Sequence, residues 1–197
     1  MKRMKSVMLY FGSFNPVHKG HVAVAEWVLE QDICDEIWLV VSPHNPLKRQ
    51  SGLIGEEHRL AMVRLAIAES RYRNRMRACD VEFDLPRPSY TADTLRVLGE
   101  RYPHVKFSVL VGSDIVGEIT RWKEWDRLLS DYEFYVYPRR GYTCSGCDPR
   151  FIMIAGAPFE DYSSTDVRRA LRSGEAGEMI PGSVRNYIKD NLADWMP

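Results

Sequence analysis

The chain contains 197 residues, which is enough for one compact domain with a sizeable buried core. Its 27 lysines and arginines balance 27 aspartates and glutamates, so the formal net charge is zero. This balance argues against broad binding to nucleic acids or to membrane surfaces, although it leaves room for a local basic pocket. The N-terminal apolar run, residues 7–11, is too short for a signal peptide, and no run approaches the ~18 residues that span a bilayer. We therefore expect a cytoplasmic protein.

Short apolar runs alternate with helical patterns along the whole chain. In chain order, the pattern predicts strands over residues 6–12, 36–42, 77–84, 105–113, 133–139 and 150–156. It predicts helices over residues 19–31, 56–70, 91–102, 122–130, 164–173 and 182–192. Continuously apolar strands that alternate with helices are typical of a parallel sheet covered on both faces. The expected fold is therefore α/β, Rossmann-like and doubly wound, with a mainly parallel sheet and helices on both faces.

No linker, repeat or low-complexity segment divides the chain. We therefore expect a single domain over residues 1–197, to which the C-terminal helical part, about 163–197, also belongs. In such a sheet, ligands bind beyond the carboxyl ends of the strands, near the switch in strand order. Three polar segments follow the first, second and fourth expected strands, namely GSFNPVHKGH (12–21), SPHNPLK (42–48) and GSD (112–114). The functional site is expected at that edge of the sheet.

The turn after the first expected strand combines two glycines, a proline and two histidines. Gly12 lets the backbone approach a ligand closely, and the start of the following helix presents unpaired N–H groups at its positive dipole end. Together these features predict an anion site, most naturally for phosphate. His18 and His21 are three residues apart and share one helical face, where their imidazoles can donate hydrogen bonds to phosphate oxygens. The segment is neither a Walker A loop nor a dinucleotide fingerprint.

The helix expected from residue 164 offers a second anion site. Ser163, Ser164 or Thr165 can cap it, and its free amides again favour an anion. Arg168 lies one turn further and can offer a planar fork to phosphate oxygens. Taken alone, the segment also fits a plain capped amphipathic helix.

The four cysteines predict no metal site. Cys34 and Cys79 stand alone in apolar or strand-like surroundings, where a cysteine is usually a small buried hydrophobe. Cys144 and Cys147 form CSGC in a glycine-containing loop, but no second pair or nearby histidine completes a zinc site. We expect an ordinary surface loop there and no metal held by the protein itself.

Two segments together resemble the signatures of a known superfamily. GSFNPVHKGH and, near the end of the chain, YSSTDVRRAL (162–171) are similar to the motifs of the HIGH-type nucleotidyltransferases, which transfer AMP or CMP onto phosphate-bearing acceptors. Within that superfamily, the chain resembles the bacterial nicotinate-mononucleotide adenylyltransferase family over nearly its whole length. The resemblance implies an enzyme of NAD biosynthesis that transfers AMP from ATP to nicotinate mononucleotide, giving deamido-NAD and pyrophosphate. It also implies Mg²⁺ held mainly by the ATP phosphates.

The resemblance implies roles for individual residues on the ATP side. His18 and His21 would hold the α-phosphate region, while Ser164, Thr165 and Arg168 would hold the β- and γ-phosphates. Lys48 would reach the triphosphate, although this chain reads PHNPLKRQ where many members of the family read closer to PNxxPPHK; a solvated basic loop is the alternative. The implied ATP-binding residues are Gly12, Ser13, Phe14, His18, His21, Lys48, Arg139, Ser164, Thr165 and Arg168. The implied catalytic residues among them are His18, His21, Lys48 and Arg168.

On the acceptor side, the resemblance implies that Thr91 and neighbouring amides meet the nicotinate carboxylate, although capping of the helix from residue 91 alone explains both Ser89 and Thr91. Trp122 would stack on the pyridine ring, and backbone amides around Lys123 would complete the carboxylate site. Asp114 would lie near ribose hydroxyls. The implied acceptor-binding residues are Ser89, Thr91, Asp114, Trp122 and Lys123.

Rival functions stay open at this stage. Another HIGH-type nucleotidyltransferase, with nicotinamide mononucleotide or pantetheine phosphate as its acceptor, is the nearest. A nucleotide-binding sensor without catalysis is a second, which the intact histidines and the Ser-Thr-Arg motif disfavour. A nucleic-acid-binding module predicts an excess of basic residues that this neutral chain lacks. A homo-oligomer is compatible with the sequence, which leaves the oligomeric state open.

Overall fold

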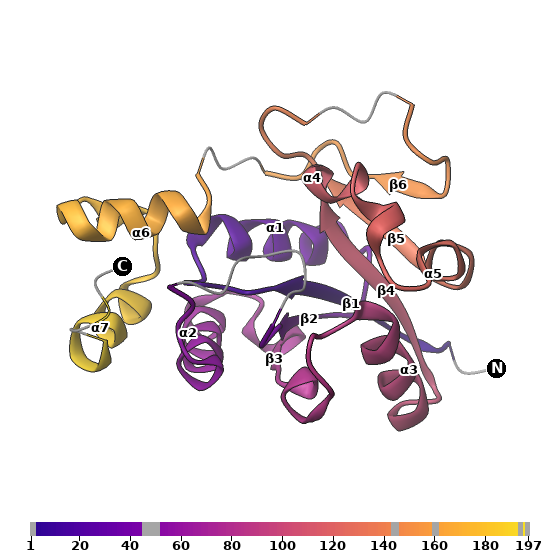
Figure 1. Ribbon diagram of the computed structural model, residues 1–197, viewed down its shortest axis with the longest axis horizontal. Helices are drawn as coiled ribbons and strands as arrows, with labels where there is room; N and C mark the ends of the chain where they lie inside the picture. Colours follow the sequence, from indigo (N-terminus) through magenta and orange to yellow (C-terminus); the bar gives the residue numbers. More distant parts are fainter. Residues whose placement is uncertain (1–2, 45–51, 143–145, 159–161, 193–194, 196–197) are drawn as a thin grey trace.

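The computed structural model describes residues 3–44, 52–142, 146–158, 162–192 and 195. Within these residues, one six-stranded sheet runs through the middle of the molecule in the order β3-β2-β1-β4-β5-β6 (Figure 1). Every neighbouring pair of strands is parallel. The bounds are β1 Lys5–Gly12, β2 Glu36–Val41, β3 Met76–Cys79, β4 Val105–Gly112, β5 Glu133–Tyr137 and β6 Phe151–Met153.

The strand order switches between β1 and β4, because β2 and β3 extend the sheet on one side and β4 to β6 extend it on the other. This switch point confirms the expected doubly wound, Rossmann-like class of fold. The helices that connect and cover the strands are α1 Lys19–Glu30, α2 Glu56–Glu69, α3 Thr91–Arg101, α4 Ser113–Val116, α5 Trp125–Asp131, α6 Ser164–Ser173 and α7 Gly182–Asn191.

Residues of β1 alternate between two apolar clusters on the two faces of the sheet. Met8 and Tyr10 join the cluster that contains α1, α2, α6 and α7. Val7 and Leu9 join the cluster that contains α3 and α5. Because both faces are covered, the strands carry runs of consecutive apolar residues, such as residues 7–11 of β1 and 109–111 of β4, which is the pattern that predicted them.

The C-terminal helices pack on the first of these clusters. Val167 of α6 and Val184 of α7 are fully buried within it. Helix α7 lies beside α2 (Figure 1), where His58 Nδ1 and the Tyr187 hydroxyl are 2.9 Å apart. The expectation of one domain over the whole chain stays a prediction, which this packing favours.

Two expected elements are wrong in part. The strand predicted over 77–84 ends at Cys79, and a 3₁₀ helix, η2 (Val81–Asp84), follows it and turns the Glu82 carboxylate toward α3. The helix predicted over 122–130 begins only at Trp125, because Glu124 takes a left-handed conformation with φ of 56°. The short α4 and the 3₁₀ helix η3 (Ile119–Arg121) precede it, and both are too short to produce a periodic pattern.

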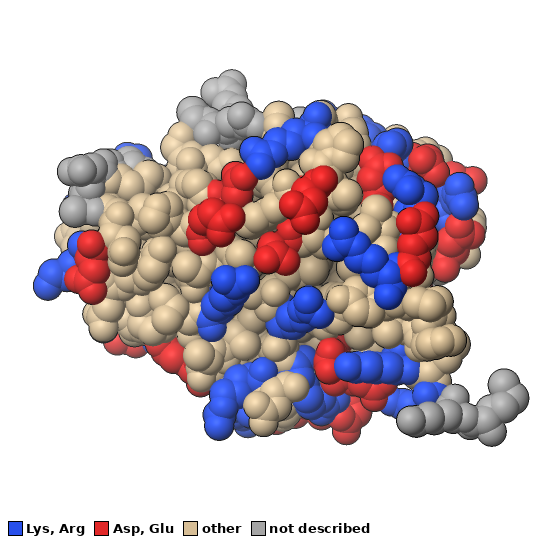
Figure 2. Space-filling view, turned by 90° about the horizontal axis from the view of Figure 1, so that it is seen from below, with Lys and Arg blue, Asp and Glu red and all other residues tan. Residues whose placement is uncertain are grey.

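Charged side chains of both signs are scattered among uncharged ones on the face seen in Figure 2. This distribution agrees with the balanced composition of the chain. Among the helices of the described residues, none combines the length and the apolar character that crossing a membrane requires.

The same substitution at two glycines should have opposite effects on stability. Gly99 lies exposed inside α3, where a Cβ meets no heavy atom within 4 Å, so Gly99→Ala should raise the free energy of unfolding by about 0.5–1 kcal/mol. Gly174 ends α6 with a φ of 76°, so Gly174→Ala should lower it by about 1 kcal/mol. Urea unfolding measures both changes. A Gly174→Ala variant as stable as the wild type would contradict the described end of α6.

Candidate functional site

A cavity of about 1280 Å³ opens at the carboxyl edge of the sheet, beside the switch point between β1 and β4. Its walls come from the ends of β1, β4 and β5 and from the starts of α1, α3 and α6. Lys48 falls outside the described residues. The structure brings the other predicted site residues together around this cavity, namely Gly12, Ser13, Phe14, His18, His21, Ser89, Thr91, Asp114, Trp122, Lys123, Arg139, Ser164, Thr165 and Arg168.

The β1–α1 turn folds back on itself at the cavity. Phe14 has a φ of 46°, and its ring covers Gly12 so closely that a Cβ on Gly12 would lie 2.7 Å from the ring. Glycine is therefore required at position 12 for steric reasons. The Asn15 side chain ties the turn to the segment before α2, since its amide donates to Gly52 O (3.0 Å) and its oxygen accepts from Ile54 N (3.1 Å).

The two histidines stack against one another at the start of α1, with ring centroids 3.6 Å apart and planes 28° from parallel. The backbone N–H of His18 donates to Nδ1 of His21 at 3.2 Å, so a neutral His21 carries its proton on Nε2. His18 is 1% exposed. Among the described residues, neither ring nitrogen of His18 has a hydrogen-bond partner. Because buried polar groups are normally satisfied, the unpartnered nitrogens make His18 a candidate for binding a ligand or an ordered water.

The protonation of His18 follows from its surroundings. Burial and, to a smaller extent, the positive charge of Arg139 together lower its pKa to about 3, against an opposing effect of Asp166. His18 is therefore neutral at physiological pH and offers one N–H donor rather than a positive charge.

Helix α6 begins directly against the β1–α1 turn. The Ser164 hydroxyl donates to Pro16 O at 3.0 Å, and Arg168 Nη1 donates to Asn15 O at 2.8 Å. Arg168 Nη2 also donates to the Thr165 hydroxyl at 3.0 Å. Ser163 is the N-cap of α6, and its hydroxyl accepts from the backbone of the third helical residue. The positive ends of α1 and α6 thus meet at one side of the cavity.

The opposite side of the cavity is built around Gly112, at the end of β4. A Cβ on Gly112 would lie 2.3 Å from Asp114 Oδ1 and 2.9 Å from Arg139 Cγ, so the two charged side chains occupy the space that any larger residue would need. Arg139 Nε and Asp114 Oδ1 are 3.6 Å apart. The Ser113 hydroxyl accepts from the backbone N–H of Arg139 at 2.8 Å.

The N-terminal region of α3 supplies a further wall of the cavity. Here the sequence predicted neither the N-cap residue of α3 nor the buried Glu82. The N-cap residue is Tyr90, without a side-chain cap, so neither Ser89 nor Thr91 acts as the N-cap. Glu82 lies beneath this wall, 1% exposed, and accepts a hydrogen bond from the Thr94 hydroxyl at 2.8 Å. Burial raises the pKa of Glu82, while hydroxyls that include that of Thr94 act in the opposite direction. Reasoning from the sequence missed Glu82 because the pattern around it indicated a strand.

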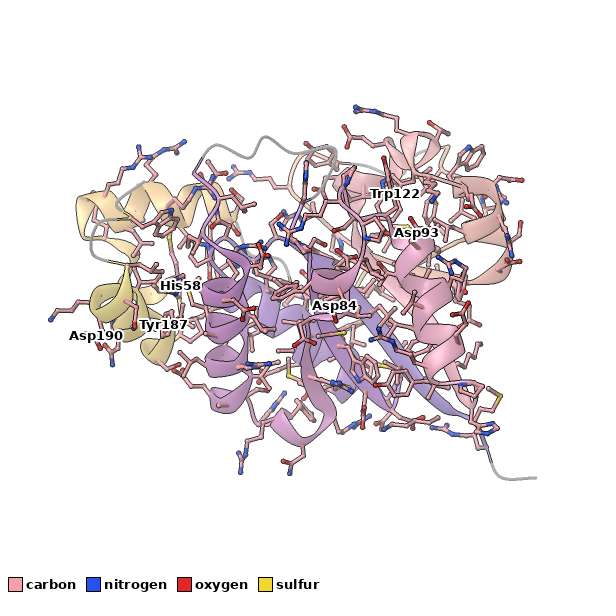
Figure 3. The ribbon with its side chains drawn as sticks, turned by 60° about the horizontal axis from the view of Figure 1, so that its bottom comes forward. His58, Asp84, Asp93, Trp122, Tyr187 and Asp190 are labelled. Atoms are coloured by element: carbon pink, nitrogen blue, oxygen red, sulfur yellow. The ribbon has the colours of Figure 1, made fainter. Side chains whose placement is uncertain are left out.

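The segment between η3 and α5 faces α3 across the cavity. Trp122 packs edge-on against Phe134, with ring centroids 6.3 Å apart. The next residue, Lys123, forms an ion pair with Asp93 of α3, with Nζ–O distances of 2.8 and 2.9 Å. Figure 3 shows Trp122 close to Asp93. The Lys123 side chain therefore joins the two walls.

The cysteines agree with the expectation from the sequence where the structure describes them. Cys34 and Cys79 are free and buried, and burial raises the pKa of the Cys34 thiol to about 12. Cys147 is free and half-buried, whereas Cys144 lies outside the described residues. Over the described ranges, no three His, Cys, Asp or Glu side chains form a group that could hold a metal ion.

Comparison with known proteins identifies the class to which this fold and site belong. A family model described as cytidylyltransferase-like matches residues 9–170. The chain therefore belongs to the cytidylyltransferase-like family and is a nucleotidyltransferase.

Individual relatives narrow the assignment. The chain is 37% identical over 187 residues to a probable nicotinate-nucleotide adenylyltransferase of Flavobacterium johnsoniae, covering 93% of this chain and 95% of that protein. It is 42% identical over 168 residues to a protein of the same description from Bacteroides fragilis, covering 85% of this chain and 82% of the relative. Within the larger family, the chain belongs with the nicotinate-nucleotide adenylyltransferases.

Solved structures confirm the fold. The chain is similar to Plasmodium falciparum nicotinic acid mononucleotide adenylyltransferase complexed with NaAD, with a TM-score of 0.81 at 23% identity. The match covers 97% of this chain and 98% of that one. The same Plasmodium protein complexed with APC gives a TM-score of 0.78 at 22% identity, with the same coverage.

The buried His18 should make stability depend on pH. Its pKa is lower in the folded chain (about 3) than the ordinary value of 6.5, so the unfolded chain binds more protons between these values and stability is lost as the pH falls through that window. We expect His18 to account for about 2 kcal/mol of the stability lost between pH 7 and pH 5. Urea unfolding of His18→Asn should therefore show a smaller loss than the wild type. The exposed His104→Asn variant, as a control, should retain the wild-type loss.

Proposed function

We propose that this nucleotidyltransferase transfers AMP from ATP to nicotinate mononucleotide, releasing pyrophosphate and forming deamido-NAD. The observation that carries the proposal is the meeting of α1 and α6 at one cavity beside the stacked histidines. The cavity of about 1280 Å³ exceeds the roughly 300–1,000 Å³ of pockets for single small ligands, which suits two nucleotides. The names of the relatives support nicotinate mononucleotide as the acceptor.

The proposed ATP site lies between the starts of the two helices. Two helix N-termini that point at one place favour a polyanion there, because their dipoles and unpaired N–H groups add. We assign the α-phosphate region to His18 and His21, and the β- and γ-phosphates to Ser164, Thr165 and Arg168. The turn residues Gly12, Ser13 and Phe14 allow close approach of the backbone, and Arg139 faces the same space. The proposed role of Lys48 in holding the triphosphate stays a prediction.

The proposed acceptor site lies between α3 and the segment before α5. Trp122 offers a flat aromatic surface to the pyridine ring. The start of α3, with Ser89 and Thr91, favours the nicotinate carboxylate electrostatically, and backbone amides around Lys123 complete that site. Asp114 can accept hydrogen bonds from ribose hydroxyls.

The proposed chemistry needs no nucleophile from the protein. The 5′-phosphate of the acceptor attacks the α-phosphorus of ATP in line, so one P–O bond forms while the bond to the β-phosphate oxygen breaks and pyrophosphate leaves. Positioning and charge stabilisation therefore carry the catalysis. The neutral His18 can donate its N–H to the transferred phosphate without desolvating a charge.

We propose that Mg²⁺ binds together with ATP, coordinated mainly by the phosphates, rather than at a metal site formed by protein side chains. The described residues hold no group of three ligating side chains, which fits an ion coordinated mainly by phosphate oxygens and water. Such an ion would neutralise part of the charge on the phosphates. The cytoplasmic location and the oligomeric state stay predictions.

The choice of acceptor is the decisive test of the proposed function. With MgATP present, turnover should be at least tenfold faster with nicotinate mononucleotide than with nicotinamide mononucleotide, a difference of about 1.4 kcal/mol, because a carboxylate gains from the start of α3 and an amide does not. A coupled assay for pyrophosphate measures both rates. A tenfold preference for the amide, or turnover with pantetheine phosphate alone, would overturn the proposed acceptor, and no turnover with any of the three would favour a nucleotide sensor.

Removal of the donor at His18 should abolish adenylyl transfer while the fold persists. We expect His18→Ala to lower kcat by about 10²–10³-fold, by analogy with the loss of one donor from a preorganised site for developing negative charge. The matched control is His104→Ala, which removes an exposed histidine and should retain wild-type turnover. Wild-type turnover in a folded His18→Ala variant would refute the proposed role.

A further inference from the structure

Arg59 of α2 is the largest of the fully buried side chains, with an exposed fraction of 0%. Within the part of the chain that the structure describes, its guanidinium donates only to backbone carbonyl oxygens. Nε donates to Ile54 O at 2.8 Å, and Nη1 donates to Ser13 O at 2.7 Å and to Ser42 O at 2.8 Å. Nη2 completes the set with Pro43 O at 3.4 Å.

These four carbonyls belong to three separate parts of the chain that meet beneath the cavity. Ser13 lies in the β1–α1 turn, and Ser42 and Pro43 follow β2. Ile54 precedes α2 and is also held by the side chain of Asn15. Ser13 and Ser42 line the cavity. One planar side chain therefore sets the spacing between the predicted phosphate-binding turn and the neighbouring strand end.

Within the described residues Arg59 forms no ion pair, and its hydrogen-bond acceptors are neutral carbonyls, so the carboxylate of Glu56 acts on its charge only from a distance. Burial lowers its pKa to about 10, against an opposing effect of Glu56, so the guanidinium stays protonated at neutral pH. A buried charge is costly unless it is compensated. The Arg59 charge lies next to the turn to which we assign the phosphates of ATP, and a bound polyanion would provide the missing compensation.

We propose that Arg59 is a positioning residue for nucleotidyl transfer: it fixes the β1–α1 turn against the end of β2 and adds a buried positive charge beneath the phosphates. This inference rests on the proposed function for its rate measurements. Lysine cannot replace the arginine, because an ammonium group cannot reproduce the fork that spans four carbonyls. Misplacement of the turn should act mainly on kcat, since the geometry at the α-phosphorus decides the rate.

The chain offers a matched control in Arg75. Its guanidinium also donates to backbone carbonyls, from Nε to Asp35 O (3.0 Å), from Nη1 to Leu29 O (3.3 Å) and from Nη2 to Cys34 O (2.8 Å). Unlike Arg59, it also forms an exposed ion pair, from Nη1 to Asp32 Oδ1 at 3.1 Å. Leu29 belongs to the last turn of α1, and Cys34 and Asp35 lie between α1 and β2, so the three carbonyls lie at the amino edge of the sheet and none belongs to a residue that lines the cavity. Substitution of Arg75 removes a similar network without touching the site.

The test compares Arg59→Lys and Arg59→Met with Arg75→Lys and Arg75→Met. Three measurements are needed, namely unfolding in urea, kcat and KM for ATP, and the affinity for inorganic pyrophosphate by calorimetry. We expect both Arg59 variants to fold and to lose at least tenfold in kcat, while the Arg75 variants lose stability and stay within twofold of the wild-type kcat. Arg59→Met should also bind pyrophosphate at least tenfold more weakly than Arg59→Lys, which keeps the charge. Added guanidinium should partly restore the kcat of Arg59→Ala but not alter that of Arg75→Ala.

Three outcomes would overturn the proposal. One is a folded Arg59→Lys variant with wild-type kcat, and another is an equal loss of kcat in the Arg75 variants. The third is failure of both Arg59 variants to fold while the Arg75 variants fold, since that would make Arg59 a structural residue only. A wild-type protein without adenylyl transfer would contradict the proposed function instead, and the comparison of pyrophosphate affinities would still test Arg59.

Discussion

The contact between the start of α6 and the β1–α1 turn is the interaction on which the proposed site depends. Residues about 150 positions apart in the chain meet there through two hydrogen bonds to backbone carbonyls, one from Ser164 and one from Arg168. Without this contact the two helix dipoles would act at different places, and neither alone would distinguish a triphosphate from any smaller anion. With this contact, the two helix starts together favour a polyanion at this edge of the cavity, although the chain as a whole has a formal net charge of zero.

Burial of polar groups explains how this edge of the cavity can attract a polyanion without a cluster of exposed lysines among the described residues. His18 is neutral because it is buried, and among the described residues its ring nitrogens have no hydrogen-bond partner, so they are available to a bound phosphate in the proposed site. Arg59 beneath the turn keeps its charge, but neutral carbonyls are its hydrogen-bond acceptors. Because these polar groups lack some hydrogen-bond partners or opposite charges in the free protein, binding of a polyanion is more favourable than it would be at a site whose groups are already paired. The free-energy cost of burying these polar groups is offset by the apolar clusters buried on the two faces of the sheet.

Much of the fold follows from local pattern. The six strands could be predicted because both faces of the sheet are covered, which gives most strands a run of consecutive apolar residues. The end of α6 at Gly174 could be predicted because the chain needs a left-handed residue there. That residues of the two motifs gather at one cavity was predictable because each motif combines several unusual residue types, whereas their roles stay predictions. Glu82 and Arg59 were not, because their roles depend on partners distant in sequence, such as Thr94 and Ser13. A charged residue within a strand-like or helical pattern looks solvent-exposed until the tertiary contacts are known.

Gly112 illustrates how little variation one wall of the cavity can accept. The space in which a Cβ would lie is already filled by the carboxylate of Asp114 and the aliphatic stem of Arg139. Every other amino acid has a Cβ, so each would displace one of the two charged side chains. A protein that keeps this placement of Asp114 and Arg139 must therefore keep glycine at position 112.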